Sequence, residues 1–222
     1  MQKNSGHRTT DHKDNHVKAG ADKVGADKTG ADKAGADKVG ADKASVAKAG
    51  GAGMGHASQP MQELFVDMLQ DIYWAEKHLT QALPKMSAAA TTEELQNAFD
   101  DHLAQTEEHV TRLEKAFKLI GHKAEAKKCE AMAGLTKEAD SMSHETKKGS
   151  LTRDVALIAA GQKVEHYEIA TYGTLVQLAS NMHMNEVAAL LEETLKEEKA
   201  ADTLLTDIAE HNVNWQALEN EN

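Results

Sequence analysis

Acidic residues recur in the middle of amphipathic segments in the last two-thirds of this chain, on the faces that should be buried. Glu76 lies within a stripe of apolar residues at helical spacing, and Glu165 and Glu198 lie in equivalent positions in two later segments. A buried ionised carboxylate costs several kcal/mol unless something neutralises it. Carboxylates that converge from several helices on one core would repel one another. The pattern therefore predicts a bound cation at a carboxylate-bridged metal site.

Helical spacing adds neighbours to two of these acids. Glu168 follows Glu165 by three residues and Asp202 follows Glu198 by four, so each pair shares a helix face. The candidate residues lie near the midpoints of their predicted helices, and the midpoints of antiparallel helices in a bundle meet at one level. A further segment supplies two histidines on one face. The predicted metal ligands are Glu76, His102, His109, Glu165, Glu168, Glu198 and Asp202.

These donors indicate which metal the site takes. Oxygen ligands with one or two imidazoles suit iron or manganese, and no set of thiolates favours zinc. Di-iron bundles hold two metals with Glu from two helices and Glu-x-x-His from the other two. The ligand types do not distinguish iron from manganese, because both metals accept the same donors.

The elements that must position these residues begin near Pro60. The pattern predicts helices over 61–90, 92–120, 151–181 and 184–211, with a shorter, more polar helical segment over 123–147. Pro84 is expected to kink or break the first helix, and Trp215 to pack against the end of the last. No stretch alternates like a strand. The predicted fold is all-α: a four-helix bundle with a short extra helix in the crossover between its second and third helices.

The residues before this point have a different composition. Five tandem pentamers (AGADK, VGADK, TGADK, AGADK and VGADK) run over 19–43, and a decayed copy, ASVAK, follows. A period of five gives neither a helix nor a strand an apolar face, and the segment holds too little apolar surface to offset the entropy of ordering it. We expect residues 1–56 to be disordered, and we divide the chain into a tail, 1–58, and a bundle domain, 59–222.

Charge and composition limit the possible partners and compartment. The chain carries a net charge of −11, although ten Lys and Arg against seven Asp make residues 1–56 positive. The acidic bundle argues against nucleic-acid binding except weakly through the tail. No apolar run is long enough for a transmembrane helix, and the N-terminus does not resemble a secretory signal. Cys129, the single cysteine, fits a reducing compartment. We expect a soluble, cytoplasmic protein.

Several blocks in the bundle domain resemble the YciE/YciF family of ferritin-like stress proteins. They are DIYWAEKHL (71–79), HLAQTEEHVTRLEKAF (102–117), KKCEAMAGL (127–135), QKVEHYEIATYGTL (162–175) and LKEEKAAD (195–202). The resemblance implies a ferritin-like bundle, a homodimer and a di-metal site. The family pattern expects Glu on the second helix, where this chain has Gln105, and His on the fourth, where it has Asp202. A neutral amide is a weak ligand, so the site could hold two ions or only one.

The sequence supports two main hypotheses about function. In the first, a di-iron or di-manganese centre reacts with peroxide or oxygen in oxidative or metal stress, by consuming peroxide or oxidising ferrous iron. In the second, the protein is not an enzyme: the hydrophilic, glycine-rich repeats protect other molecules during desiccation or osmotic stress, and the bundle is a structural dimer. A weaker third hypothesis makes the tail a DNA-associating arm. The sequence names no substrate.

Overall fold

The computed structural model describes residues 53–54 and 57–220. Helices make up this part of the chain, and it contains no strand. The helices are α1 (Gln59–Ala89), α2 (Glu93–Leu119), α3 (Glu130–Glu145), α4 (Leu151–Asn181), α5 (Asn185–Ile208) and α6 (Asn214–Asn220), with a π-helical turn, η1 (Ala209–Val213), between the last two. The disorder and the repeats predicted for residues 1–56 lie almost wholly outside the described residues, although Met54 is buried against the bundle.

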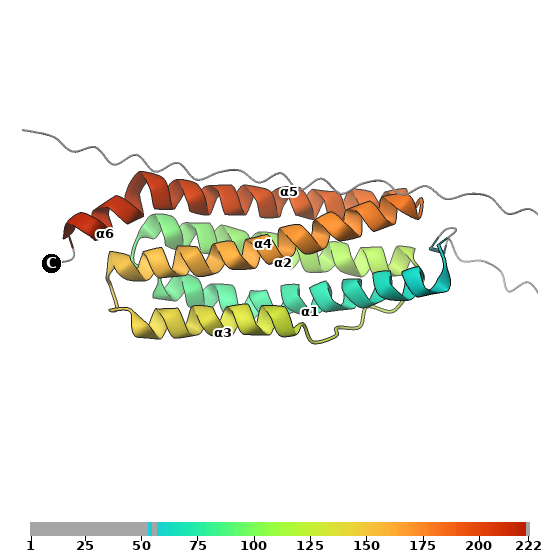
Figure 1. The fold of residues 1–222 in the computed structure, drawn as a ribbon, viewed down its shortest axis with the longest axis horizontal. Helices are drawn as coiled ribbons and strands as arrows, with labels where there is room; N and C mark the ends of the chain where they lie inside the picture. The colour runs from blue at the N-terminus through green and yellow to red at the C-terminus, as the bar shows by residue number, and fades with distance from the viewer. Residues whose placement is uncertain (1–52, 55–56, 221–222) are drawn as a thin grey trace, which may run out of the picture. The chain divides into compact units, whose positions relative to one another are not determined.

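The four long helices lie side by side as a bundle, which confirms the predicted ferritin-like fold (Figure 1). Helices α1 and α5 run in one direction, and α2 and α4 run in the other. Since α2 and α4 are parallel, the chain must return along the bundle between them, and α3 lies in this crossover, packed on α4 and α1. The apolar stripes of the long helices face inward and form the core between them.

The helices differ from the predicted ones at three places. The last helix is predicted to end at residue 211, but α5 is followed directly by η1 and α6, which continue to Asn220. Helix α1 continues without a break through Pro84, which is exposed near the end of the helix, so that only one outward-facing backbone hydrogen bond is lost. Helix α3 begins only at Glu130, not near residue 123. Residues 122–128 are largely exposed and lack an apolar face that could hold a helix against the bundle.

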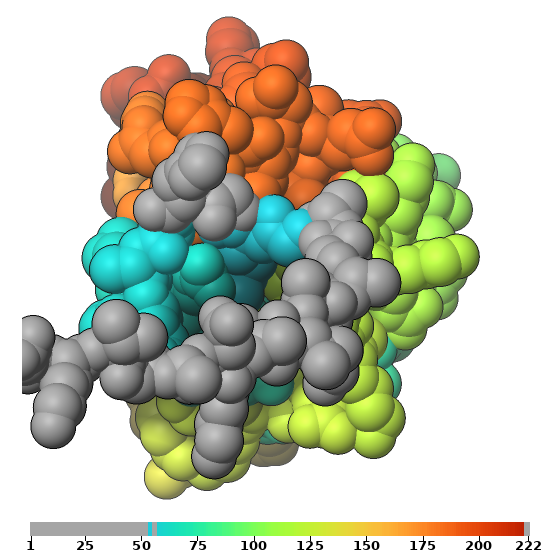
Figure 2. Space-filling view, turned by 90° about the vertical axis from the view of Figure 1, so that its right-hand side faces the viewer, coloured from blue at the N-terminus to red at the C-terminus, as the bar shows by residue number. Residues whose placement is uncertain are grey.

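Figure 2 shows the end of the bundle at which α1 begins, α2 ends and the turn between α4 and α5 lies. Helix α2 ends at Leu119, and the predicted stop, Gly121, follows its C-cap with a φ of 74° that suits glycine. The N–H of His122 donates to the Phe117 carbonyl oxygen at 2.9 Å. The expectation that Trp215 packs against the last helix is wrong, because 65% of this residue is exposed.

No described helix is both long and apolar enough to cross a membrane.

A buried aspartate fixes the start of α2. The carboxylate of Asp154 on α4 accepts hydrogen bonds from the backbone N–H of Thr91 at 2.6 Å and of Thr92 at 2.8 Å, and from the Thr92 hydroxyl at 2.8 Å. The first N–H groups of a helix have no partner within it. Asp154 therefore caps α2 from a neighbouring helix and helps to hold the ends of α2 and α4 at one level.

Removing this cap is expected to destabilise the bundle. Asp154→Ala leaves three partly buried donors of Thr91 and Thr92 without an acceptor, so we expect the free energy of unfolding to fall by roughly 2–4 kcal/mol. Urea denaturation measures the loss, and Asp100→Ala, at an exposed position on α2, provides the control. Equal stabilities of the two variants would show that the cap contributes nothing.

Candidate metal centre

Acids and histidines from all four long helices meet in the middle of the bundle. Glu76 comes from α1, His102 and His109 from α2, Glu165 and Glu168 from α4, and Glu198 from α5. Each lies on the apolar face of its helix, and the most exposed of them, His102, is only 5% exposed. Six of the seven predicted ligands therefore lie together in the core.

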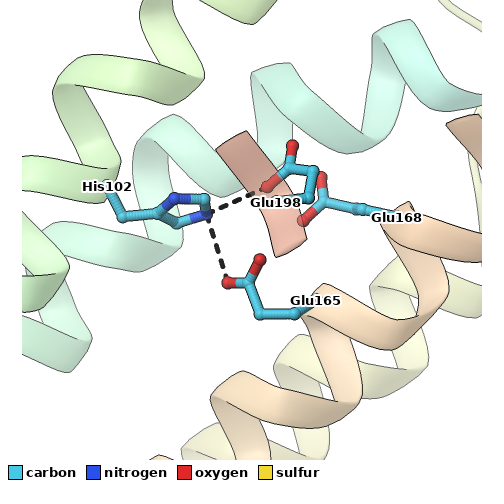
Figure 3. Close-up of side chains that lie close together, drawn as sticks. All are labelled: His102, Glu165, Glu168 and Glu198. Atoms are coloured by element: carbon cyan, nitrogen blue, oxygen red, sulfur yellow. Dashed lines mark ion pairs between the residues drawn. The ribbon is translucent and has the colours of Figure 1, made fainter. Parts of the chain in front are cut away.

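The first group of possible ligands combines one imidazole with three carboxylates. His102, Glu165, Glu168 and Glu198 each offer an atom within 4.8 Å of the others, and their side chains point toward one another (Figure 3). His102 Nε2 lies 3.3 Å from Glu165 Oε1 and 3.8 Å from Glu198 Oε2. These donors can surround one cation.

The second group shares a residue with the first. It contains Glu76, His109 and Glu198, again with one atom of each within 4.8 Å of the others. His109 Nδ1 lies 3.0 Å from Glu198 Oε1 and 3.5 Å from Glu76 Oε1. The two oxygens of Glu198 thus face different histidines, so this residue is placed to bridge two cations.

Many polar atoms of these groups are buried and have no hydrogen-bond partner in the described part of the chain. They are Glu76 Oε2, His102 Nε2, His109 Nδ1, Glu165 Oε2 and both carboxylate oxygens of Glu168 and of Glu198. Buried polar atoms are normally paired, and the equally buried Asp154 has a donor on each oxygen. Unpaired acceptors that converge on common points are what a cation site requires.

Neighbouring side chains fix the orientation of the two imidazoles. His102 Nδ1 lies 3.5 Å from Gln105 Oε1, which favours a proton on Nδ1 and leaves the lone pair on Nε2, toward the acids. His109 Nε2 lies 2.9 Å from Glu197 Oε2, which leaves Nδ1 for the site. Arg112 binds the same Glu197 carboxylate. Such partners set the tautomer of histidines that bind metals.

These contacts revise the interpretation of Gln105 and add Glu197 to the surroundings of the site. Gln105 is exposed and its Oε1 lies beside His102 Nδ1, the ring nitrogen that does not face the acids, so its amide supports His102 and does not replace a carboxylate ligand. Glu197, which is not among the predicted site residues, contacts His109. The sequence held no signal for this contact, because it depends on the distance between α2 and α5.

Tyrosines near the site behave differently from one another. Both Tyr73 and Tyr172 lie on the stripes that carry the acids, which allowed either to support a ligand. Tyr172 donates a hydrogen bond to Glu76 Oε1 and is fully buried. Tyr73 instead donates to Glu114 at 2.8 Å, away from the two groups. Tyr172 thus holds one oxygen of Glu76 and leaves the other unpaired.

Asp202 is the predicted ligand that joins neither group. Its Oδ1 lies 3.2 Å from His166 Nε2 and 3.5 Å from Gln162 Nε2, at the outer edge of the contact between α4 and α5. Cys129 also lies outside both groups. It is buried at the start of α3, and burial raises the pKa of its thiol, as expected for a small core residue.

The protonation of the site follows from its burial and crowding. Burial raises the pKa of Glu76, and burial together with the charge of Glu198 raises the pKa of Glu165 and Glu168 well above the usual range. Burial lowers the pKa of His102. Burial alone would also lower that of His109, but the carboxylates of Glu198 and Glu76 raise it to about 11. Without a cation, the site therefore retains protons that divalent ions would displace.

Comparisons with known proteins agree with the resemblance noted in the sequence. Residues 60–218 match a family model described as a domain of unknown function, DUF892. Protein YciF of Escherichia coli (strain K12) is 46% identical over 158 residues, which cover 71% of this chain and 95% of YciF.

Solved structures of related proteins show the same fold. The crystal structure of the E. coli stress protein YciF has 45% sequence identity and a TM-score of 0.67, and the match covers 71% of this chain and 99% of that one. YcfI from Rhodopseudomonas palustris, described as a proposed structural protein, has 40% identity and a TM-score of 0.64, with 68% and 96% covered. This chain therefore belongs to the DUF892 family and is a relative of YciF.

Proposed function

We propose that this protein is a stress protein whose bundle holds two iron or manganese ions and uses them to react with peroxide or to oxidise ferrous iron. The observation that carries the proposal is the set of unpaired, buried carboxylate and imidazole atoms from four helices. The relationship to the E. coli stress protein YciF supports a role in stress.

The charges of the site favour two ions over one. The two groups together contain the carboxylates of Glu76, Glu165, Glu168 and Glu198, and none of these carboxylates forms an ion pair with a lysine or arginine in the described part of the chain. Four carboxylates with neutral imidazoles carry a charge that two divalent cations balance. With a single ion, the remaining carboxylates would stay neutralised by the protons that their raised pKa lets them keep, and a second divalent ion would displace those protons.

The donors fit iron or manganese in two separate positions. His102, Glu165 and Glu168 would hold one ion, His109 and Glu76 the other, and Glu198 would join them. When bound, such a pair of redox-active ions supplies two electrons to an oxidant without releasing a radical. The surrounding residues keep the imidazoles in the tautomers that face the ions and shield the acids from bulk water.

A structural role is the competing proposal, and the description of YcfI favours it. In that case a metal, if bound, would only stabilise the bundle, and removal of the metal would lower thermal stability without any loss of chemistry. Peroxide consumption and ferrous oxidation by the metal-loaded protein separate the two roles.

The experiment that tests the proposal is elemental analysis of the purified, untagged protein and of Glu165→Ala. We expect close to two iron or manganese ions per chain in the wild type and a clear loss in the variant, because Glu165 lies in the first group. Full-length protein that binds no metal, even after incubation with ferrous or manganous ion under anaerobic conditions, would refute the proposed function.

A further inference from the structure

A hollow of about 160 Å³ lies between α2 and α5, next to the first group of ligands. His102 and Glu165, both buried, form its inner end, while the exposed residues Ala200 and Leu204 lie at its outer edge. The hollow therefore leads from the surface toward the side chains that Figure 3 shows pointing at one another. At about 30 Å³ per molecule in the liquid, it has room for roughly five waters.

Two alanines create this space. Ala201 follows Glu198 by three residues on α5, and Ala98 precedes His102 by four on α2, so each alanine lies about one turn from a residue of the site. Because α2 and α5 are antiparallel, both alanines fall on the same side of the site. Longer side chains at these positions would fill the space between the helices.

The chemistry of the lining selects what can enter. Apart from His102, the titratable side chains in the lining are the carboxyl groups of Asp101 and Glu165, and no lysine or arginine contributes. The rest of the wall is largely apolar, including Phe99 and Leu205. The carboxylate of Asp101, which is exposed at the rim, repels anions, and the small volume excludes bulky molecules. A small uncharged molecule is the solute that this lining fits best.

We propose that this hollow is the route by which a small uncharged oxidant, of the class of hydrogen peroxide, reaches the site, and that Ala201 sets the size limit. The inference rests on the proposed function, because an oxidant is relevant only if metal is bound. It adds to that function a defined approach: the oxidant arrives at the His102 and Glu165 side of the first group, not at His109.

Blocking the hollow tests the route separately from metal binding. Ala201→Leu adds three carbon atoms that project into the hollow without changing a ligand, and Ala98→Leu does the same from the α2 wall. Ala189→Leu is the matched control, since Ala189 is exposed on α5 outside the hollow. All variants are loaded anaerobically with ferrous iron, and their iron content and melting temperature are compared with those of the wild type.

Nitric oxide, a neutral diatomic molecule that binds ferrous iron, is the first probe, and its binding is followed by stopped-flow absorbance and electron paramagnetic resonance. We expect equal iron contents but an association rate at least roughly tenfold lower in Ala201→Leu than in Ala189→Leu, since a closed route must open before the probe can bind. Oxidation by hydrogen peroxide should slow in parallel. tert-Butyl hydroperoxide should react more slowly than hydrogen peroxide with the wild type, and Ala201→Gly should reduce that difference.

The outcomes distinguish this inference from the function on which it rests. Iron-loaded Ala201→Leu and Ala98→Leu proteins that bind nitric oxide within twofold of the control rate would overturn the route and leave the metal centre intact. A wild-type protein that takes up no iron would overturn the proposed function and the route with it. If Ala201→Leu does not fold, the association rate of nitric oxide with Ala98→Leu, compared with that of Ala189→Leu, tests the route in its place.

Discussion

Replacing Glu198 by alanine is expected to abolish the binding of both metal ions. Glu198 belongs to both groups, with Oε1 3.0 Å from His109 Nδ1 and Oε2 3.8 Å from His102 Nε2. The substitution removes one oxygen donor from each of the two groups of ligands, and it removes the shared carboxylate that would contact both metal ions. Mutating a residue that only hydrogen-bonds to a metal ligand lowers metal affinity by about 10- to 100-fold. Because Glu198 would be a ligand itself, we expect the affinity for each ion to fall by at least about 100-fold.

Other substitutions should have smaller, separable effects. Glu168→Ala removes a donor from the first group alone, and Glu76→Ala from the second alone, so each variant should retain about one ion per chain. Asp202→Asn should retain both, because Asp202 faces His166. Elemental analysis of the four proteins measures this pattern. One ion remaining in Glu198→Ala would show that the two positions are independent and that Glu198 does not bridge them.

Thermal stability gives a second measure of the same effect. A ligand at 100 times its dissociation constant stabilises the folded state by about 2.7 kcal/mol, which corresponds to roughly 5–10 °C in a domain of this size. We expect manganese to raise the melting temperature of the wild type by at least this much and to leave that of Glu198→Ala unchanged.

The apolar stripes of this sequence were sufficient to predict the bundle and most of the candidate site. A helix has a fixed period, so an acid such as Glu76 that falls within an apolar stripe must face the core. The long helices have similar lengths, which places their midpoints at one level. The sequence alone was therefore sufficient to predict that six of the candidate ligands lie close together in the core. Helix boundaries in the polar crossover, where α3 begins, lacked such a pattern.

Asp202 shows where this reasoning fails. The buried stripe of α5 passes through Glu198 and Leu205, and the positions between them, Ala201 and Asp202, lie on either side of it. Ala201 faces the hollow beside α2, whereas Asp202 contacts His166 on α4. Spacing along one helix places both residues near the stripe. The positions of α2 and α4 determine that one side of the stripe borders the hollow and that the other side contacts His166.

Raising the pH from 7 to 9 is expected to destabilise the metal-free protein. The pKa of His109 is raised to about 11, so its proton stabilises the folded state fully below the unfolded value of about 6.5 and progressively less as pH rises through the folded value. The raised pKa of Glu165 and Glu168 acts in the same direction, because these groups release their protons at a higher pH in the folded state than in the unfolded chain. The lowered pKa of His102 acts only below about pH 6.5, outside this range.

The expected loss is up to about 2–3 kcal/mol for each proton held throughout this range, since one proton changes stability by about 1.4 kcal/mol per pH unit. Calorimetry of chelator-treated protein at pH 7, 8 and 9 measures it. His109→Gln, which removes one of these protons, should show a shallower decline. A metal-free wild type whose melting temperature rises over this range would contradict the buried, proton-holding site.

Metal binding should remove this dependence of stability on pH. Carboxylates and imidazoles must lose their protons to bind a cation, so divalent ions compete with the protons on His109, Glu165 and Glu168. With manganese bound under anaerobic conditions, these groups no longer gain or lose protons between pH 7 and 9, and stability should vary little. The stabilisation by metal, measured as the difference between loaded and chelated protein, should therefore increase with pH. A difference that stays constant would mean that manganese binds elsewhere, because binding at the two groups must displace the protons of His109, Glu165 and Glu168.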